Sequence, residues 1–154
     1  LLDGRIVRLP TVVVRPGAPS AAASSFASGI IRESLKGIRN TLPVSRDLEL
    51  WVCSPTTVVK NLVKVKEIPA EKFGDSRVVN LPGITVSVQE MLDALKAVGG
   101  DEAISQIEEQ RDPAIEAIVG SWPARFDGSR AYGLGLAEPE GILETVQAFH
   151  ATLN

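Results

Sequence analysis

The chain has 154 residues, a formal net charge of −3, 44 % apolar and 23 % charged residues, a composition typical of one globular domain. It lacks the Lys/Arg clusters that nucleic acid or a membrane surface would need, and its apolar runs fall far short of the roughly 20 residues of a bilayer span. The single cysteine, Cys53, excludes an internal disulfide and predicts a reducing, cytoplasmic setting, and one Cys with one His makes no metal-ligand set.

The first predicted element is a buried β-strand over residues 5–14, which is rich in β-branched side chains. Pro16 and Pro19 end this strand, and an Ala-Ser run through Ser25 leads into a predicted amphipathic helix that extends to Leu35. A buried strand needs neighbouring strands on both sides, and only a few residues precede this one. We therefore expect part of the folded protein to lie outside this chain.

The middle of the chain predicts a surface loop over residues 39–47, a short strand over 48–53 and a helix capped by Ser54 or Thr56. Pro55 would stand in the first turn of that helix, where its missing N–H costs nothing. The side chains expected on the apolar face of the helix are Val58, Val59, Leu62, Val63 and Val65, and a linker is expected over residues 67–76.

The second half predicts a buried strand followed by helices. The strand covers Val78–Leu81, and Ser87 with Glu90 forms a capping box for the helix that follows. That helix is expected to extend to Gly100. Three further helices are expected from Asp101 through Ile107, from Pro113 to Val119, and from Glu140 to Leu153.

Strands alternating with helices predict an α/β fold with a parallel sheet. Two buried strands that flank a helical insertion cannot form a sheet of normal size by themselves, so the sheet would keep an unpaired edge. Such an edge favours association. We therefore expect either a homodimer or association with a part of the protein outside this chain.

Two motifs of nucleotide-dependent dehydrogenases are absent from the sequence. No G-x-x-G-x-x-G turn follows a strand to hold a pyrophosphate at a helix N-terminus. The only tyrosine is Tyr132, and Leu136 stands four residues later, so the chain has no Tyr-x-x-x-Lys pair. We expect the chain by itself to lack catalytic residues and to be inactive.

Several sequence blocks nevertheless resemble one family, the extended short-chain dehydrogenase/reductases, also called the NAD-dependent epimerase/dehydratase family. The resemblance is closest to the group of D-erythronate dehydrogenases and similar nucleoside-diphosphate-sugar epimerase-like proteins. It covers nearly the whole chain, and the blocks that carry it are Arg8–Thr11, Arg15–Gly17, Ala22–Phe26, Gly29–Glu33, Glu49–Val65, Arg77–Gly83, Ser87–Glu90 and Ser129–Gly135.

The resemblance implies that residues 1–154 are the C-terminal, mainly helical substrate-binding portion of such an enzyme. Strands over residues 5–14 and 77–82 would be the last two parallel strands of a Rossmann-type sheet, and the N-terminal dinucleotide-binding portion would be absent. By the same resemblance, Leu9 and Pro10 fall where the family's backbone contacts the nicotinamide of NAD or NADP. Thr11 falls where sugar-nucleotide epimerases carry a substrate-binding Asn.

The residues around the first loop also indicate an anion site. Ser24 and Ser25 precede a helix, whose free N–H groups favour an anion. Arg15 or Arg32 could pair a carboxylate in a bidentate manner. The alternative is structural, with Ser24 as a helix N-cap and Arg32 as a solvated helix residue.

Three functional hypotheses remain open at the level of sequence. The first is an NAD(P)-dependent dehydrogenase acting on a short polyhydroxy acid, with a small carboxylate sugar acid as the substrate. The second is a nucleoside-diphosphate-sugar epimerase or dehydratase, for which Arg46, Arg111 and Arg125 could clamp the diphosphate. The third is a non-catalytic binding module. The choice between NAD and NADP depends on a residue outside the chain.

Other conspicuous side chains are interpreted structurally. Cys53 reads as a small buried hydrophobe, and His150 as a packing or surface residue. Trp51 and Trp122 could line a pocket, Trp122 being the better candidate, but both are interpreted as core aromatics. Glu108 and Glu109 are interpreted as the solvated face of a helix.

Overall fold

The computed structural model describes residues 2–153, in which strands and helices alternate. The elements in chain order are β1 (Ile6–Arg8), β2 (Thr11–Val12), α1 (Ser25–Leu35), β3 (Asn40–Leu42), β4 (Glu49–Cys53), α2 (Pro55–Glu67), the 3₁₀ helix η1 (Ala70–Phe73), β5 (Val78–Asn80), β6 (Ile84–Ser87), α3 (Val88–Ile104), β7 (Ile107–Glu109), α4 (Pro113–Gly120), α5 (Ser129–Gly133) and α6 (Ile142–Ala151).

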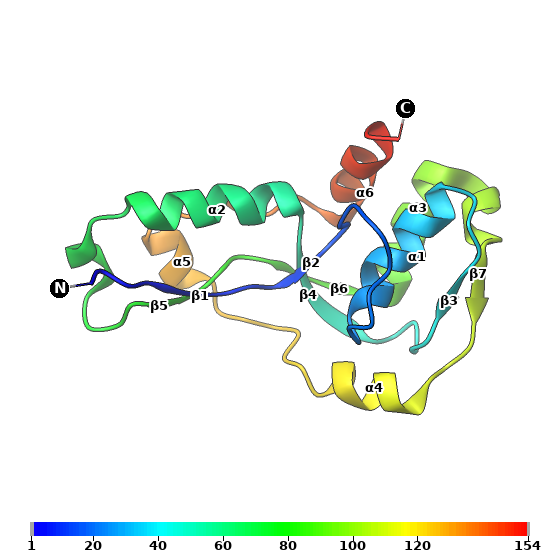
Figure 1. The fold of residues 1–154 in the computed structure, drawn as a ribbon, viewed down its shortest axis with the longest axis horizontal. Coiled ribbons are helices and arrows are strands. Elements are labelled where there is room, and N and C mark those ends of the chain that lie inside the picture. Colours follow the sequence, from blue (N-terminus) through cyan, green and yellow to red (C-terminus); the bar gives the residue numbers. More distant parts are fainter. Residues whose placement is uncertain (1, 154) are drawn as a thin grey trace.

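One end of the molecule is a strand layer, made of β1, β5, α2, η1 and α5 (Figure 1). β1 and β5 are adjacent and parallel, with Ile6 opposite Val78. Below α2, apolar side chains from the helix and the two strands share one small core, which includes Val58, Val65 and Val79. The predicted parallel pairing of the two buried strands, with the helix packed close by, is confirmed.

The predicted first strand is interrupted, and this corrects the sequence analysis. β1 pairs with β5, whereas β2 pairs in parallel with β4 in a different sheet. The break falls at Leu9 and Pro10, and proline cannot donate a hydrogen bond to a strand ladder. The strand is also less buried than predicted, since Ile6 is 59 % exposed. The segment predicted as one strand therefore contributes one short strand to each of two sheets.

The opposite end is a helical lobe, built on α1, α3 and α6 with α4 and the β3–β7 pair around them (Figure 1). α3 packs against both α1 and α6. A three-stranded central sheet, in the order β2-β4-β6, joins this lobe to the strand layer, and its β4–β6 pair is antiparallel. Val13, Leu50 and Val86 from this region belong to the same core as the lobe helices.

Three short strands were not predicted. Residues 40–42, expected in a loop, form β3, and residues 107–109, expected in a helix, form β7, which pairs with β3 in parallel. Residues 84–87, which end at the capping-box residue Ser87, form β6. Glu108 and Glu109 therefore lie on an edge strand and not on a helix. Pairing between distant segments here outweighs the weak local preference for helix.

The helix boundaries follow their local signals. The Ser54 hydroxyl accepts a hydrogen bond from the Thr57 N–H at the start of α2. Ser87 and Glu90 form both hydrogen bonds of the predicted capping box at the start of α3. α3 bends at Gly100, whose positive φ of 67° separates the two predicted helices. These interactions satisfy N–H groups that would otherwise be unpaired.

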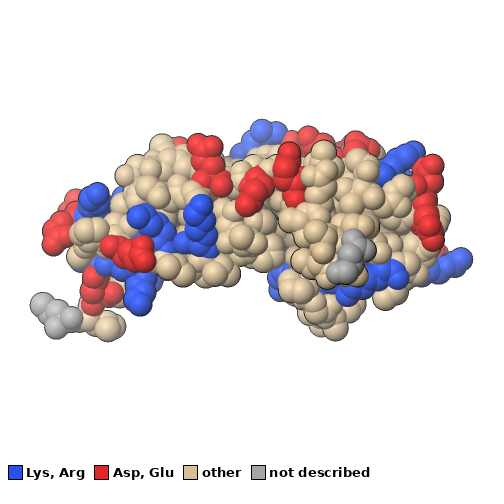
Figure 2. Space-filling model, turned by 90° about the horizontal axis from the view of Figure 1, so that it is seen from above, with Lys and Arg blue, Asp and Glu red and all other residues tan. Residues whose placement is uncertain are grey.

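The outer side of α2 differs from the prediction. Val58 and Val65 are buried, but Val59, Leu62 and Val63 of the predicted apolar face are exposed. Figure 2 shows the face of the molecule on which α2 lies, where acidic and basic side chains are interspersed. The predicted linker over residues 67–76 contains η1, and its Phe73 is buried. Among residues 2–153, no helix combines the length and apolar character that crossing a bilayer requires.

Candidate functional site

The candidate site lies where the chain passes from one sheet to the next. Leu9 and Pro10 connect β1 to β2, and the two strands take different partners on either side of this point. In open α/β sheets, ligands bind in the crevice beyond the carboxyl ends of strands that diverge. The break in the first strand therefore creates the kind of crevice in which a ligand binds.

Two cavities meet at this break. A polar cavity of about 340 Å³ is lined by Leu9, Pro10, Thr11, Val12, Arg15, Ser24 and Trp122. An apolar cavity of about 160 Å³ is lined by Leu9, Pro10, Thr11, Glu49, Leu50, Trp51, Trp122, Pro123 and Phe126. The structure thus brings together five residues predicted from the sequence, namely Leu9, Pro10, Thr11, Arg15 and Ser24.

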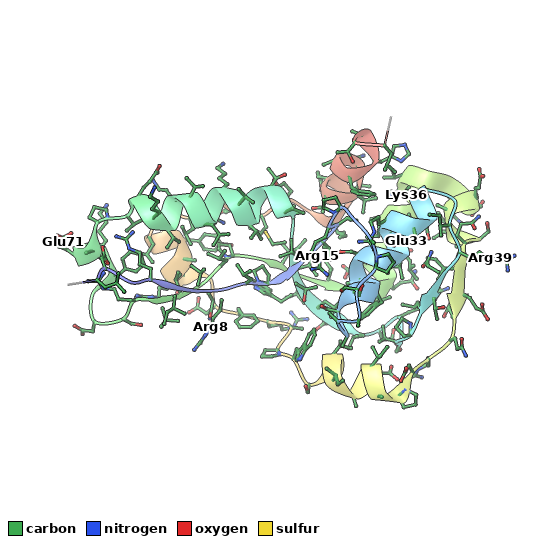
Figure 3. The ribbon with its side chains drawn as sticks, in the orientation of Figure 1. Arg8, Arg15, Glu33, Lys36, Arg39 and Glu71 are labelled. Atoms are coloured by element: carbon green, nitrogen blue, oxygen red, sulfur yellow. The ribbon has the colours of Figure 1, made fainter. Side chains whose placement is uncertain are left out.

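Helix α1 fixes the backbone of Arg15. The N–H of Arg15 donates to the Ser28 hydroxyl over 3.1 Å, and that hydroxyl lies 3.3 Å from the carbonyl oxygen of Val12. The carbonyl of Arg15 accepts a hydrogen bond of 2.9 Å from the Arg32 guanidinium. The Arg15 side chain is exposed and, among the described residues, forms no ion pair. Figure 3 shows Arg15 between the end of β2 and α1.

Arg32 lies beneath this loop and not in the cavity. It is 2 % exposed, and its Nε donates to Glu33 Oε1 over 2.8 Å. Its Nη2 and Glu33 Oε2 are buried without a hydrogen-bond partner among the described residues. The alternative of a solvated Arg32 is therefore wrong. The observed contacts place Arg32 as a support for the Arg15 carbonyl.

The two serines are placed differently. Ser24 occupies the N-cap position of α1 but its hydroxyl makes no capping hydrogen bond, so the hydroxyl is available to the polar cavity. Ser25 accepts a hydrogen bond of 3.0 Å from the Ser20 N–H. Ser25 lines a separate cavity of about 770 Å³ on the other side of the loop, near Arg111.

The sequence analysis missed an aromatic group at this site. Trp51 and Phe126 pack with ring centroids 5.3 Å apart, and both line the apolar cavity together with Trp122. The preferred interpretation of the two tryptophans as core residues is therefore incomplete, and the alternative that they line a pocket agrees with the structure. The Trp-Pro pair at residues 122–123, in a stretch without helix or strand pattern, was the available signal, since an aromatic residue in a loop often lines a site.

The remaining candidates show no catalytic arrangement. Burial, followed by the nearby Glu140 carboxylate, raises the pKa of the Cys53 thiol to about 11, so the thiol stays protonated and inert near neutral pH. His150 lies half-buried near the end of α6. Within residues 2–153 there is no group of His, Cys, Asp or Glu side chains that could hold a metal ion.

The three arginines considered for a diphosphate clamp are all paired. Arg46 forms an ion pair with Glu109. Arg111 pairs with Glu116 over 2.6 Å, and Arg125 pairs with Glu49 over 2.5 Å. Because each guanidinium already faces a carboxylate, the three do not form an open basic clamp.

The parallel β1–β5 pair with α2 packed on it, the crevice at the strand break and the polar cavity beside it define a protein of the α/β class with a candidate ligand site. Known proteins agree with that class. The chain is 45 % identical to a D-erythronate dehydrogenase of Cupriavidus necator and 41 % identical to one of Haemophilus influenzae, each over 148 residues and 96 % of the chain. It covers 46 % and 47 % of those proteins, so it spans about half the length of the curated relatives it matches.

A solved structure shows the same arrangement. The nucleoside-diphosphate-sugar epimerase from Agrobacterium tumefaciens superposes with a TM-score of 0.89 at 36 % identity, over 95 % of this chain and 43 % of that one. No family model matches the sequence. Over nearly its whole length the chain therefore shares its fold and part of its sequence with dehydrogenase and epimerase proteins, of which it covers somewhat less than half.

Proposed function

We propose that the protein is the substrate-binding part of an NAD(P)-dependent dehydrogenase that acts on a short polyhydroxy acid such as D-erythronate. The observation that carries this proposal is the polar cavity, where Thr11, Arg15 and Ser24 meet around a guanidinium without an ion-pair partner. A carboxylate placed there would gain charge-assisted hydrogen bonds. The names of the two curated relatives support the same substrate class.

The residues at the strand break fit the nicotinamide end of the cofactor. Leu9 is largely exposed and, with Pro10, lines both cavities, so it offers an apolar surface on which a flat ring can pack. When bound, the nicotinamide would accept a hydride from the substrate. By the family resemblance, the tyrosine base and its lysine belong to the half of the relatives that this chain does not cover.

In this scheme the chain's own residues bind and orient the substrate. Arg15 would hold the carboxylate, and the Thr11 and Ser24 hydroxyls would bond to substrate hydroxyls. The contacts from Ser28 and Arg32 to the Arg15 backbone would keep the guanidinium in place. Orientation of this kind lowers the entropic cost of reaching the reactive geometry.

We also propose that the N-terminal half typical of the relatives covers the open side of the strand layer. Among the described residues β1 pairs only with β5, and parallel strands are normally buried on both faces. A right-handed crossover into β1 would place the preceding helix beside α2, where Val59 and Val63 are exposed. A homodimer that uses this surface is the alternative. The single buried Cys53 fits a cytoplasmic setting.

The same arrangement predicts that residues 1–154 alone have no dehydrogenase activity and no measurable affinity for the cofactor. The reason is that they contain neither the Gly-rich turn nor the Tyr-x-x-x-Lys pair. Calorimetric titration with NAD and with NADP tests this prediction. Binding tighter than millimolar would contradict the half-enzyme interpretation.

The substrate class is tested with Arg15→Ala in the full-length enzyme. Because charged hydrogen bonds contribute about 1.5–3 kcal/mol, the variant should raise KM for an aldonate by roughly one to two orders of magnitude. An uncharged polyol should be affected much less. The matched control is Arg8→Ala, because Arg8 is an exposed arginine that lines a different cavity and points away from the β1–β5 pair (Figure 3).

Three results would count against the proposal. Equal losses for the acid and the polyol would make Arg15 a structural residue. Efficient turnover of a nucleotide sugar would favour the epimerase alternative. A full-length protein that binds the acid but transfers no hydride would favour the non-catalytic binding module.

A further inference from the structure

A strap formed by Ser121–Gly128 connects α4 to α5 and passes from the helical lobe to the strand layer (Figure 1). It has no helix or strand of its own, but its contacts fix it. The Thr85 hydroxyl on β6 donates to the Ala124 carbonyl over 2.7 Å. Arg125 pairs with Glu49 on β4, and Phe126 packs on Trp51. The strap is therefore held against β4 and β6 of the central sheet by three contacts.

Trp122 is the strap residue that reaches both cavities of the candidate site. Leu9, Pro10 and Thr11 of the first strand region also line both cavities. Trp122 is therefore the part of the shared wall that the strap supplies. On one side of this wall are Arg15 and Ser24. On the other side are Leu50, Trp51 and Phe126. The wall thus separates a polar space from an apolar one.

We propose that Trp122 is a specificity-determining residue, which closes the substrate pocket and keeps acids with an apolar tail out of the cavity behind it. This inference rests on the proposed function, because it concerns the length of the acid bound by Thr11, Arg15 and Ser24. The chemical class excluded is a 2,3-dihydroxy acid extended by an alkyl chain.

The surroundings of Trp122 favour a partition over a purely structural role. Its side chain is 39 % exposed, so folding does not depend on burying it completely. Its backbone N–H donates to the Val119 carbonyl at the end of α4, which holds the main chain even when the side chain is changed. Removing the indole would connect the apolar cavity of about 160 Å³ to the substrate pocket.

The energetic consequence can be stated per methylene group. Each CH₂ that enters an apolar cavity contributes about 0.8 kcal/mol, which is about a fourfold change in affinity. An alkyl tail of three carbons that reached Leu50, Trp51 and Phe126 would therefore gain roughly 10- to 100-fold in kcat/KM relative to a four-carbon acid.

The experiment uses the full-length enzyme with D-erythronate and 2,3-dihydroxyheptanoate as competing substrates. Trp122→Ala should raise the ratio of kcat/KM for the longer acid over the shorter one by roughly 10- to 100-fold, and Trp122→Phe should keep the ratio near its original value. Tyr132→Ala is the matched control, because Tyr132 is an aromatic residue of similar exposure, 41 %, that lines neither cavity.

The outcomes separate the two proposals. If the unmodified enzyme oxidises D-erythronate but Trp122→Ala leaves the ratio unchanged, the partition is wrong and the proposed function stands. If the unmodified enzyme oxidises neither acid, the proposed function is wrong, and the role proposed for Trp122 in substrate specificity is wrong as well. Thermal melting monitors folding. If Trp122→Ala and the milder Trp122→Leu both lose the cooperative transition, Trp122 is a core residue and the partition is overturned.

Discussion

The helical lobe and the strand layer differ in how completely they bury their apolar side chains. In the lobe, Ile30, Leu42 and Leu95 are fully buried in a core that α1, α3, α6 and the central sheet enclose. The strand layer has a smaller core between α2 and the β1–β5 pair. Its outer surfaces expose Ile6 on β1 and Val59 and Val63 on α2. The lobe is closed, whereas the strand layer leaves apolar side chains exposed.

This difference shows which part of the chain the covering half proposed above would bury. Apolar surface that stays in water gains nothing from folding, and a large exposed apolar patch normally marks an interaction site. The proposed site lies at the junction of the two regions. The lobe supplies the fixed backbone around Arg15, and the strand layer supplies the exposed Leu9.

The largest effect is expected from breaking the buried ion pair of the lobe. Arg32→Ala would leave the Glu33 carboxylate buried without its partner, which costs about 3–5 kcal/mol. Urea unfolding of the chain measures the loss. The exposed Arg39→Ala should stay within about 0.5 kcal/mol. A loss for Arg32→Ala below about 1 kcal/mol would show that water reaches the pair.

The comparison itself is tested by removing apolar groups from each region. Leu95→Ala should destabilise the chain by about 2–5 kcal/mol, because it leaves a cavity in the closed lobe. Val63→Ala should change the stability of the chain by less than about 0.5 kcal/mol, since that side chain is exposed. In the full-length protein, Val63→Ala should cost about 1–2 kcal/mol. Equal small effects of Val63→Ala in both proteins would contradict a covered α2 face.

A smaller effect is expected at the start of α3. Ser87→Ala removes the hydroxyl that accepts from the Glu90 N–H, and loss of such a cap costs about 1 kcal/mol. Ser87→Thr should restore most of the stability, because threonine also caps helices. Denaturant titration of both variants measures their free energies of unfolding. A threonine variant as unstable as the alanine variant would assign the loss to packing.

The smallest effect concerns Glu140, which accepts hydrogen bonds from the Ser54 and Thr57 hydroxyls at the start of α2. Burial alone would raise the pKa of Glu140, but hydrogen bonds from its own backbone and these hydroxyls hold the pKa below 4.5. The carboxylate therefore stabilises the fold above about pH 4.5, and this contribution disappears as the pH falls through the lowered pKa.

Glu140→Gln should accordingly reduce stability at neutral pH by less than about 1 kcal/mol, because the side chain is largely exposed. The difference from the unmodified chain should vanish in acid. Thermal melting between pH 3 and pH 7 measures it. A constant difference across this range would show that the lost interaction is independent of the Glu140 charge.

The helices were predictable because their signals are local. Ser54 with Pro55, and Ser87 with Glu90, fix helix starts through contacts within four residues. The short strands β3 and β7 were not predictable, because they form by pairing with each other across a wide separation in sequence. A segment of three residues with weak strand preference does not indicate which distant segment it will pair with.

The candidate site divides in the same way. Leu9, Thr11, Arg15 and Ser24 lie within one short stretch, so sequence could place them together. Arg32 lies in the same stretch, but α1 is buried on several sides, and periodicity does not reveal which side faces a cavity. Trp51, Trp122 and Phe126 come from distant segments, and only folding brings them to the strand break.

By itself, the sequence determined the helix starts, the parallel pairing of the two valine-rich strands, the absence of the cofactor-binding and Tyr-Lys motifs, and the polar half of the pocket. The helix starts, the missing motifs and the polar half of the pocket depend on residues within a short stretch. The parallel pairing was expected from the alternation of strands with helices. The tertiary structure decided the break of the first strand, the burial of Arg32 and the aromatic wall around Trp122. These depend on which distant segments pair and pack, and long-range packing is set by the whole chain at once.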